Sequence, residues 1–417
     1  MLAEIIAVGS ELLTTYRQDT NSLYLTAGLN ELGVTVAFKT IGGDQREQLT
    51  FSVEIALNRA DIVLLSGGLG PTEDDLTREC VAQALHLPLE RDQLLLDELQ
   101  QRFAARNMQM TENNRRQADH IHGSTILPNR NGSAPGQWLE VIFNGRRRLV
   151  ALLPGPPAEL QPIFDSECKP RLTAALPPNH LARRQLRMTL IPESHVDARS
   201  APIYKKFSDV QTTILAGNAE IQLHFSCVKP TLAEAEARVE AVADAVSREM
   251  GDDVFSANGE SLEEVVLLML GVRRHTLAIA ESCTGGLIGQ RLTSVPNSSR
   301  VFLGGAVAYS NRSKTALADV PAYLIDEHGA VSEAVARALA EGIRRRIGSS
   351  LALSVTGIAG PTPPRGKDAQ RPVGLVYIAL TDGKETQVKE LNIHGSRERI
   401  RLWAAQHALE MLRRRLL

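Results

Sequence analysis

Short apolar runs alternate with amphipathic segments over residues 1–170. The runs AEIIAVG (3–9) and ADIVLLSGG (60–68) are continuous, and each ends in glycine and polar residues. Such runs are typical of buried parallel strands. Helical periodicity follows at residues 21–32 and 76–85. The pattern predicts a doubly wound α/β domain, in which ligands bind at the carboxyl ends of the strands.

Residues 171–257 contain shorter and more polar segments. Strand-like segments are expected at 183–192 and 219–228, with a short helix between them at 195–207. A strongly amphipathic helix then begins after Thr231, a typical N-cap, and stops at Gly251. This segment contains no cluster of nucleophile, base and metal ligands. We therefore expect a small α+β domain that acts as a spacer or dimerisation element.

Residues 258–417 return to an α/β pattern. The expected strands are 275–280, 351–357 and 373–380, with helices at 261–274, at 330–347 and from Arg397 to the end. The stretch PTPPRGKDAQRP (361–372) is polar and rich in proline, which predicts an irregular, mobile surface loop. The chain is thus expected to contain three domains.

The composition is that of a soluble globular protein, with 43% apolar and 23% charged residues in 417. No apolar run approaches the ~20 residues of a membrane span, and the first residues lack the basic segment of a signal peptide. These features predict a cytoplasmic protein without a membrane partner. The four cysteines lie far apart without a CxxC motif, which argues against a zinc knuckle or a disulfide framework.

Charge is distributed unevenly between the two ends of the chain. From residue 261 onward there are 21 Lys and Arg against 14 Asp and Glu, whereas the remainder has 25 against 34. A basic domain suits an anionic substrate, although most of these arginines can equally be a solvated surface. No basic stripe interleaved with aromatic residues is present, so we expect no direct nucleic-acid partner.

The motif AESCTGG (280–286) lies where a strand is expected to end and a helix to begin. A serine on such a turn is lifted out of the sheet, and Gly285 and Gly286 allow backbone amides to approach a ligand closely. These features suit a nucleophile, Ser282, beside an oxyanion or phosphate pocket. The neighbouring Cys283 is an alternative nucleophile, although a buried cysteine more often acts as a small apolar side chain.

A serine nucleophile needs a base, and GGAVAYSNRSK (304–314) offers one. A partly desolvated Lys314 can accept the serine proton, with the hydroxyl of Tyr309 relaying or orienting it. His328 and His394 remain alternatives if the fold brings them close. Considered singly, Lys314 can also be a solvated surface lysine and Tyr309 a packing residue. A further glycine-rich turn, VTGIAGP (355–361), can supply amides to substrate oxygens.

The motifs AESCTGG, GGAVAYSNRSK, HGAVSE, VTGIAGP and RPVGLVYIAL, in this order, closely resemble the carboxy-terminal domain of the CinA family. The resemblance implies a nicotinamide-nucleotide amidohydrolase over residues 258–417. Its substrate would be nicotinamide mononucleotide, converted to nicotinate mononucleotide and ammonia without a metal. The family pattern makes Ser282 the nucleophile and Tyr309 and Lys314 its assistants, and it allows other residues at Cys283.

The same resemblance suggests how the substrate would be held. The amides near Thr284, Gly285 and Gly286 would stabilise the oxyanion. The substrate phosphate would rest on the turn at Thr356 and Gly357, together with an arginine from a second subunit. A homodimer is the expected oligomeric state.

A second site is expected in the first domain, where GSELLTTYRQDTNS (9–22) and SGGLGPTEDDLT (66–77) both follow strands. A glycine-rich turn beside carboxylates suits phosphates and a divalent cation held by Asp74 or Asp75. LPGPPAEL (153–160) would close this pocket. The acidic residues, Glu73 included, can also simply favour a helix N-terminus.

Residues 3–170, including LPNRNGSAPG (127–136), resemble the molybdopterin-binding fold in the version fused to CinA. This implies metal-dependent hydrolysis of ADP-ribose, with Mg²⁺ or a similar cation and potassium as a further candidate. The metal ligands would be Asp19, Asp74 and Asp75, and the phosphate amides would come from Gly67, Gly68 and Gly70.

The resemblance has one departure and leaves alternatives. Thr15 stands where the family usually has glycine, so its side chain is expected to narrow the approach to a phosphate. Residues 171–257 would be the KH-like domain of CinA proteins. The amino-terminal half can instead be a pterin- or nucleotide-binding module without turnover, and the whole protein a competence or recombination accessory.

Overall fold

The structure is a computed structural model that describes residues 1–105, 107, 109–177, 179–217, 219–363 and 366–417. It divides into two compact units, residues 1–182 with 228–235 and residues 183–227 with 236–417. No helix in the described part of the chain is long and apolar enough to cross a bilayer.

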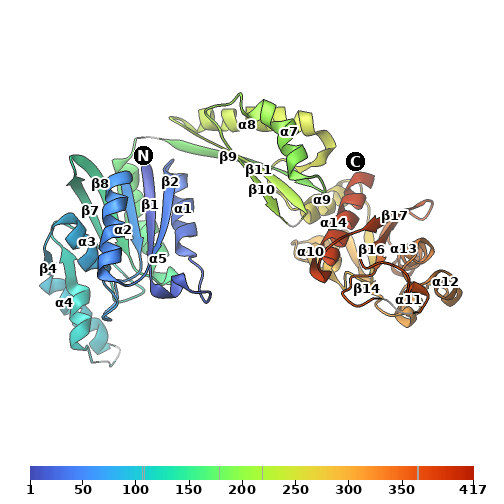
Figure 1. The fold of residues 1–417 in the computed structure, drawn as a ribbon, viewed down its shortest axis with the longest axis horizontal. Helices are drawn as coiled ribbons and strands as arrows, with labels where there is room; N and C mark the ends of the chain where they lie inside the picture. The colour runs from blue at the N-terminus through green and yellow to red at the C-terminus, as the bar shows by residue number, and fades with distance from the viewer. Residues whose placement is uncertain (106, 108, 178, 218, 364–365) are drawn as a thin grey trace. The chain divides into compact units, whose positions relative to one another are not determined.

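The first unit is built on a six-stranded sheet in the order β2-β1-β3-β8-β7-β6 (Figure 1). Its first four strands are parallel, and β7 and β6 add an antiparallel edge. In sheet order the strands are β2 (Thr35–Gly42), β1 (Leu2–Val8), β3 (Ile62–Ser66), β8 (Arg146–Leu153), β7 (Gly136–Phe143) and β6 (Thr125–Leu127).

Helices cover both faces of this sheet. Alternate side chains of β1, β3 and β8 pack against α2 (Arg46–Arg59) and α3 (Thr77–Leu85) on one face. On the other face they pack against α1 (Asn21–Glu31), α5 (Pro157–Ile163) and α6 (Lys169–Ala175). The doubly wound α/β prediction is therefore confirmed.

Smaller elements complete the first unit. A two-stranded ribbon pairs β4 with β5. The strands of the ribbon are β4 (Leu89–Arg91) and β5 (Asp119–Ile121). The remaining helices of the first unit are α4 (Gln93–Ala105), η1 (Ser10–Leu13), η2 (Glu112–Ala118) and η3 (Phe164–Cys168).

The second unit begins with a four-stranded sheet in the order β10-β11-β9-β12. These strands and the helices beside them are β9 (His180–Thr189), β10 (Gln211–Gly217), β11 (Glu220–Lys229), β12 (Val254–Ser256), α7 (Glu193–Tyr204), α8 (Leu232–Met250) and η4 (Gly251–Asp253). The long helix α8 starts after Thr231 and ends before Gly251, as the capping pattern predicts.

A five-stranded sheet in the order β14-β13-β15-β16-β17 forms the rest of the second unit. The first three strands are parallel and the last two antiparallel. The strands are β13 (Leu277–Glu281), β14 (Phe302–Val307), β15 (Leu351–Gly357), β16 (Leu375–Thr381) and β17 (Thr386–Asn392).

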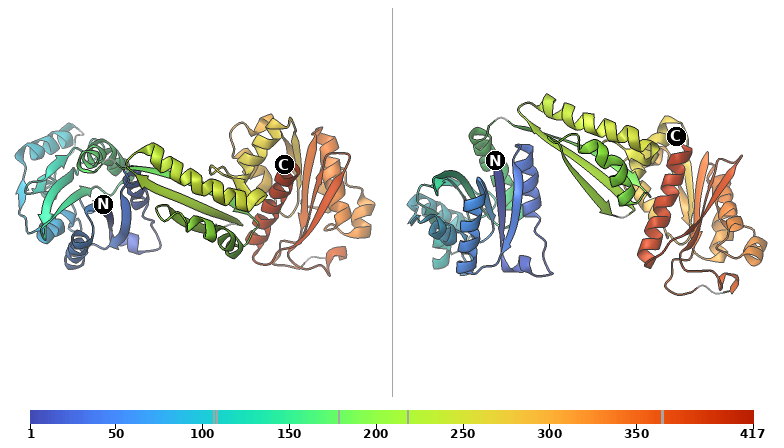
Figure 2. Two further views of the ribbon diagram at one scale, coloured as in Figure 1. Left: turned by 90° about the horizontal axis from the view of Figure 1, so that it is seen from above. Right: turned by 45° about the horizontal axis from the view of Figure 1, so that its top comes forward.

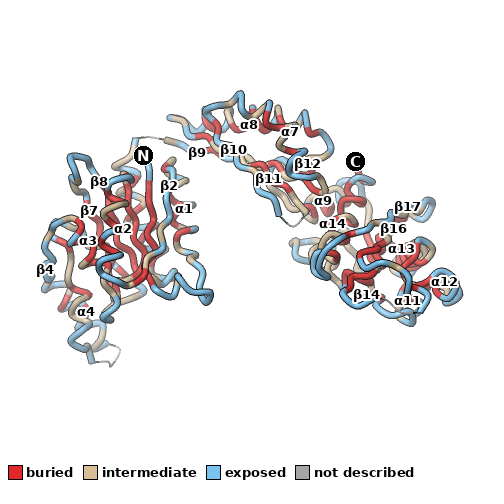
Figure 3. The backbone as a smooth tube through the Cα atoms, in the orientation of Figure 1, coloured by how far each residue is buried: buried red, intermediate tan, exposed pale blue. Residues whose placement is uncertain are grey.

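Two groups of helices enclose this sheet, one on each side (Figure 2). One core includes α9 (Leu262–Val272), α10 (Leu287–Thr293) and α14 (Arg397–Arg415). The other includes α11 (Asn311–Ala318), α12 (Ala322–His328) and α13 (Glu333–Ile347). A short turn, η5 (Ser298–Arg300), precedes β14. Figure 3 shows that the central strands of both large sheets are buried.

The proline-rich loop expected at 361–372 is irregular, and its residues 364 and 365 lie outside the described part. It contains one short turn, η6 (Gly366–Asp368). The Asp368 side chain is buried and accepts backbone hydrogen bonds from Ala330 (3.0 Å) and Val331 (3.3 Å). This part of the loop is therefore fixed to the segment that precedes α13.

Candidate active sites

Ser282 lies on the turn that joins β13 to α10. Its amide donates to the Val355 carbonyl of β15 (2.9 Å), which fixes the start of the turn against the neighbouring strand. Gly285 (φ +61°) and Gly286 (φ +92°) then take the left-handed conformation that glycine adopts without strain. The serine is largely enclosed, with 7% of its surface exposed.

Lys314 is the side chain that the fold brings to Ser282. A capping box at Ser310 starts α11 directly after β14, and Lys314 lies in the first turns of that helix, 2% exposed. Its Nζ is 2.9 Å from Ser282 Oγ and 3.0 Å from the Ala308 carbonyl oxygen. Burial lowers the pKa of Lys314. A neutral amine here can donate to Ala308 and accept the serine proton.

Tyr309 does not lie between these two side chains. It is 59% exposed, and its hydroxyl accepts a hydrogen bond from Arg397 Nη2 (2.7 Å). The same guanidinium donates to the Gly360 carbonyl (2.6 Å). The structure therefore places Tyr309 beside α14, and the expected assistance to Ser282 stays a prediction.

The amides of the glycine turn are engaged by a carboxylate. Glu281, which is 2% exposed, accepts hydrogen bonds from the amides of Gly286 (3.0 Å), Ile288 (3.1 Å) and Gly289 (2.8 Å). The Gly285 amide closes the turn onto the Ser282 carbonyl (3.0 Å). The expectation that the amides of Gly285 and Gly286 bind an oxyanion is therefore wrong. These glycines are required for the shape of the turn.

Two other amides remain available beside the serine. Among the described residues, no oxygen accepts a hydrogen bond from the backbone N–H of Cys283 or of Thr284; the Cys283 sulfur is the group that interacts with both. The Thr284 hydroxyl is also buried without a partner among the described residues. The amides at the start of α10 donate to Glu281. An oxyanion would therefore be bound by the amides of Cys283 and Thr284, which precede the two glycines.

Two arginines of α14 lie at the same turn. Arg401 donates to the Thr284 carbonyl (2.8 Å), and Arg397, one helical turn earlier, holds Tyr309 and Gly360. In the described chain neither guanidinium forms an ion pair with a carboxylate. These two cations beside the serine turn were not among the residues predicted from the sequence. Their i,i+4 spacing in RERIR was the available signal.

Thr356 and Gly357 have packing roles. The Thr356 hydroxyl donates to the Ala330 carbonyl (2.9 Å), so its proton is not free for a phosphate. A Cβ at Gly357 would lie 2.7 Å from Val376 Cγ2 and 3.0 Å from Cys283 Sγ. Close packing therefore requires glycine there. The expectation that the backbone amides of this turn hold the substrate phosphate stays a prediction.

Other potential reactive groups are less suited to nucleophilic or base catalysis. Burial raises the pKa of the Cys283 thiol to about 12, so it remains protonated at neutral pH. His328 and His394 do not hydrogen-bond to Ser282; Lys314 is the side chain that does so within the described residues. The serine–lysine pair is the best candidate for covalent chemistry.

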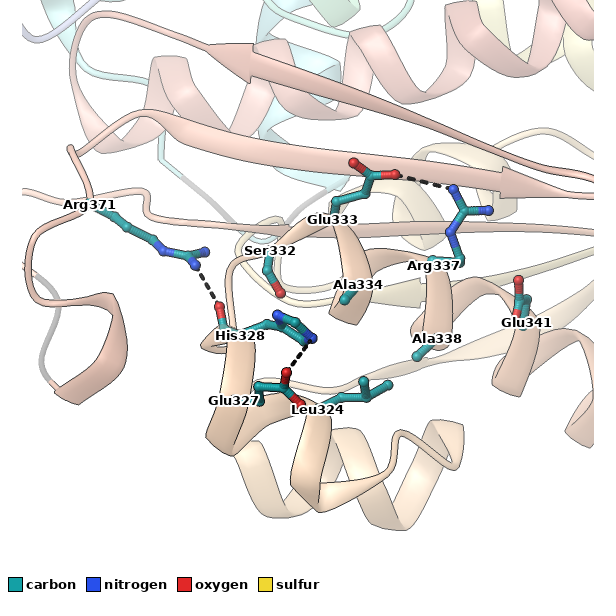
Figure 4. A pocket seen from close by; sticks show the side chains of 10 residues that line it. All are labelled: Leu324, Glu327, His328, Ser332, Glu333, Ala334, Arg337, Ala338, Glu341 and Arg371. Atoms are coloured by element: carbon teal, nitrogen blue, oxygen red, sulfur yellow. Dashed lines mark hydrogen bonds and ion pairs between the residues drawn. The ribbon is translucent and has the colours of Figure 1, made fainter.

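A separate pocket of about 690 Å³ lies between α12 and α13 (Figure 4). Its polar side chains are largely paired with one another. Glu333 contacts Arg337 (3.2 Å), Arg371 donates to the His328 carbonyl (2.5 Å), and His328 lies 3.8 Å from Glu327. We assign no chemistry to this pocket, because its charges are compensated internally.

The first unit has its own pocket, about 730 Å³ in volume, at the carboxyl ends of β1, β3 and β8. All the residues predicted for this site line it: Asp19, Gly67, Gly68, Gly70, Asp74 and Asp75. Thr15, which was expected to narrow the approach, is not among the lining residues. The fold therefore brings these residues together at the strand ends, and their role in binding phosphate and metal stays a prediction.

The three aspartates differ in how many hydrogen bonds their carboxylates already accept. Asp75 Oδ2 accepts from both the amide (2.8 Å) and the hydroxyl (2.5 Å) of Thr72, so it stabilises its own loop. Asp19 Oδ1 accepts from the Ser22 amide at the start of α1 (2.9 Å). A hydrogen bond from Thr72 lowers the pKa of the exposed Asp74. Among the described residues, no three His, Cys, Asp or Glu side chains are grouped to hold a metal.

An α/β domain with a pocket at its strand ends and a second α/β domain with a buried serine–lysine pair define a two-site protein. Residues 4–174 match the model of the probable molybdopterin binding domain, and residues 259–416 match that of the CinA C-terminal domain. Over 417 residues the chain is 55% identical to the CinA-like protein of Acidobacterium capsulatum, covering all of both chains. It therefore belongs to the CinA family.

Other matches carry related names. The chain is 41% identical to the putative competence-damage inducible protein of Symbiobacterium thermophilum, over all of this chain and 99% of that protein. The solved structure of the competence/damage inducible protein CihA from Agrobacterium tumefaciens is 35% identical, with a TM-score of 0.35. That match covers 36% of this chain and 91% of the other.

Proposed function

We propose that the carboxy-terminal domain hydrolyses the carboxamide of nicotinamide mononucleotide, giving nicotinate mononucleotide and ammonia. The observation that carries this proposal is the 2.9 Å contact between Ser282 Oγ and a buried Lys314 amine. A lysine whose pKa is lowered by burial can act as a general base without a histidine. The family resemblance supplies the substrate.

In the acylation step, the neutral amine of Lys314 takes the proton of Ser282 while Oγ attacks the carboxamide carbon. The resulting tetrahedral intermediate carries its negative charge on the former carbonyl oxygen. Lys314 then returns the proton to the leaving nitrogen, the C–N bond breaks, and ammonia departs. A water molecule, deprotonated by the same amine, hydrolyses the ester and restores Ser282.

Two groups of donors suit the substrate's developing and permanent charges. The amides of Cys283 and Thr284, to which no oxygen of the described residues is bonded, suit the oxyanion. Arg397 and Arg401 are cations without a carboxylate partner in the described chain, and they suit the phosphate of the nucleotide. They are a second candidate for phosphate binding, beside the turn at Thr356 and Gly357.

The direct test is ammonia release from nicotinamide mononucleotide by wild type, Ser282→Ala and Cys283→Ala. Wild type and Cys283→Ala should release ammonia, and Ser282→Ala should not. The absence of ammonia with wild type would remove the proposal. An active Ser282→Ala together with an inactive Cys283→Ala would transfer the nucleophile to the thiol.

We propose a second activity for the amino-terminal pocket, the hydrolysis of ADP-ribose at its pyrophosphate. The observation that favours it is the meeting of a glycine-rich loop with exposed carboxylates in one pocket. Mg²⁺ is commonly held by one or two carboxylates and completed by substrate phosphates, so Asp19 and Asp74 fit a hard cation. When bound, such a cation would neutralise phosphate charge.

AMP release from ADP-ribose, measured with and without a divalent cation, tests this second activity. We expect cation-dependent release that falls strongly in Asp74→Asn and Asp19→Asn. Asp75→Ala is less informative, because it also removes the acceptor that holds Thr72. Binding of ADP-ribose without release of AMP would instead favour a non-catalytic nucleotide-binding module.

A further inference from the structure

A buried arginine lies beneath the glycine-rich loop of the amino-terminal pocket. Arg78, the second residue of α3, is 1% exposed. Its Nη1 donates to the Leu69 carbonyl (2.7 Å) and its Nη2 to the Gly70 carbonyl (3.1 Å). Within the described residues no carboxylate forms an ion pair with it. An arginine remains charged in a protein, so a buried positive charge without an ion-pair partner among the described residues lies directly under the loop.

The preceding residue continues this anchoring. Thr77 Oγ1 donates to the Gly67 carbonyl (2.8 Å), and the Thr77 amide donates to the Gly68 carbonyl (3.1 Å). Together Thr77 and Arg78 therefore hold four consecutive carbonyls, those of residues 67–70. All four are drawn toward the start of α3.

This anchoring determines where the loop amides point. In a planar trans peptide the N–H is antiparallel to the preceding carbonyl. The amides of Gly68, Leu69 and Gly70 must therefore point away from Thr77 and Arg78. None of the three has an acceptor in the described chain, and all three residues line the pocket. Successive amides that point the same way form an anion-binding concavity.

The charge of the pocket makes the buried cation important. Its lining contains six carboxylates and one basic side chain, Arg17; the acidic residues are Glu11, Asp19, Asp44, Asp74, Asp75 and Glu159. Such a lining repels phosphates. Arg116 also supports the loop, through the Thr72 carbonyl (3.1 Å), but its charge is paired with Glu79 (2.6 Å). Arg78 is thus the buried cation at this loop that forms no ion pair among the described residues.

We propose that Arg78 is a positioning residue that makes loop 67–70 a pyrophosphate-binding site. It turns the loop amides toward the pocket and adds positive charge beneath a predominantly acidic lining. The inference rests on the proposed phosphate chemistry of this pocket and deepens it. Arg78 itself is not expected to touch the ligand.

Calorimetric titration of the full chain with inorganic pyrophosphate and with ADP-ribose tests this role. Arg78→Met should weaken the binding of both by about tenfold or more, because charge-assisted hydrogen bonds are lost and the amides are released. Arg148→Met is the matched control. Arg148 is 3% exposed and donates to the Leu57 carbonyl (2.6 Å) at the other end of β8, so its loss should leave binding unchanged.

A second pair of variants separates charge from packing and serves if Arg78→Met does not fold. Arg78→Lys keeps the charge, whereas Arg78→Gln keeps a donor and loses the charge, so Lys should bind pyrophosphate more tightly than Gln. Equal affinities in this pair, or wild-type affinity in Arg78→Met, would overturn the inference. Wild type that binds neither ligand would overturn the proposed amino-terminal function itself, and this inference with it.

Discussion

Replacing Lys314 by methionine should separate catalysis from stability. Methionine has nearly the same length and keeps the buried site filled, but it removes the amine that contacts Ser282 at 2.9 Å. The serine then has no base among the described residues. The same substitution at the exposed Lys384, on the turn between β16 and β17, is the matched control.

The loss of activity can be scaled from the role of the amine. A positioned general base contributes roughly 10²–10⁴ in rate, or about 3–5 kcal/mol of activation free energy. The effect on stability should be much smaller. Removing a desolvated amine is favourable, whereas leaving the Ala308 carbonyl without its donor costs about 1–3 kcal/mol. The two contributions oppose each other, so the free energy of unfolding should change little.

The pH dependence has a definite sign. The pKa of Lys314 is lower in the folded than in the unfolded chain. Between these two values the unfolded chain binds the extra proton, so the free energy of unfolding rises with pH through this interval. Activity should rise as pH passes through the lowered pKa of the folded state, where the native amine becomes neutral. Lys314→Met should lose both dependences.

Steady-state ammonia release and urea unfolding, each measured across pH, provide the test. We expect kcat/KM to fall at least about a hundredfold in Lys314→Met and to stay at the wild-type value in Lys384→Met. A Lys314→Met enzyme that keeps more than about a tenth of wild-type kcat/KM would refute the general-base role.

Three further changes probe the turn around the serine. Glu281→Gln should lower kcat and should lower the free energy of unfolding, measured in urea titrations, by about 1–3 kcal/mol. The reason is that one amide oxygen cannot replace a carboxylate that accepts three hydrogen bonds. Unchanged stability would contradict this. Gly357→Ala should lower the thermal midpoint, since its Cβ would collide with Val376 and the Leu375 carbonyl (2.9 Å); a wild-type midpoint would disprove the packing role. Cys283 should resist thiol reagents at pH 8 until the chain unfolds, and rapid labelling of the native protein would refute its raised pKa.

The serine and lysine of the carboxy-terminal site could be predicted from the sequence because both follow adjacent strands of one sheet. Ser282 follows β13, and Lys314 follows the adjacent parallel strand β14. The two residues are 32 positions apart in the sequence, but they lie side by side at the carboxyl ends of these strands. Thr231 and Gly251 also predicted where α8 begins and ends. In the amino-terminal domain, strand-end glycines and aspartates gathered in one pocket for the same reason.

The sequence did not predict features that depend on the direction of backbone N–H groups or on contacts between residues far apart in the chain. Nothing in the motif AESCTGG indicates that Glu281 turns back to bind the amides that the glycines were expected to offer. Arg401 contacts Thr284 across 117 residues, and this contact exists only because α14 packs on the same face as α10. The strand β2 was missed because most of its residues are exposed and its pattern is weakly apolar.

The most direct test of the central claim is the mass of the protein after rapid mixing with nicotinamide mononucleotide and an acid quench. We expect a transient adduct of the substrate minus ammonia, located on the peptide that contains Ser282 and absent from Ser282→Ala. An adduct on Cys283, or ammonia release without any covalent adduct on the serine peptide at early times, would contradict the serine–lysine mechanism.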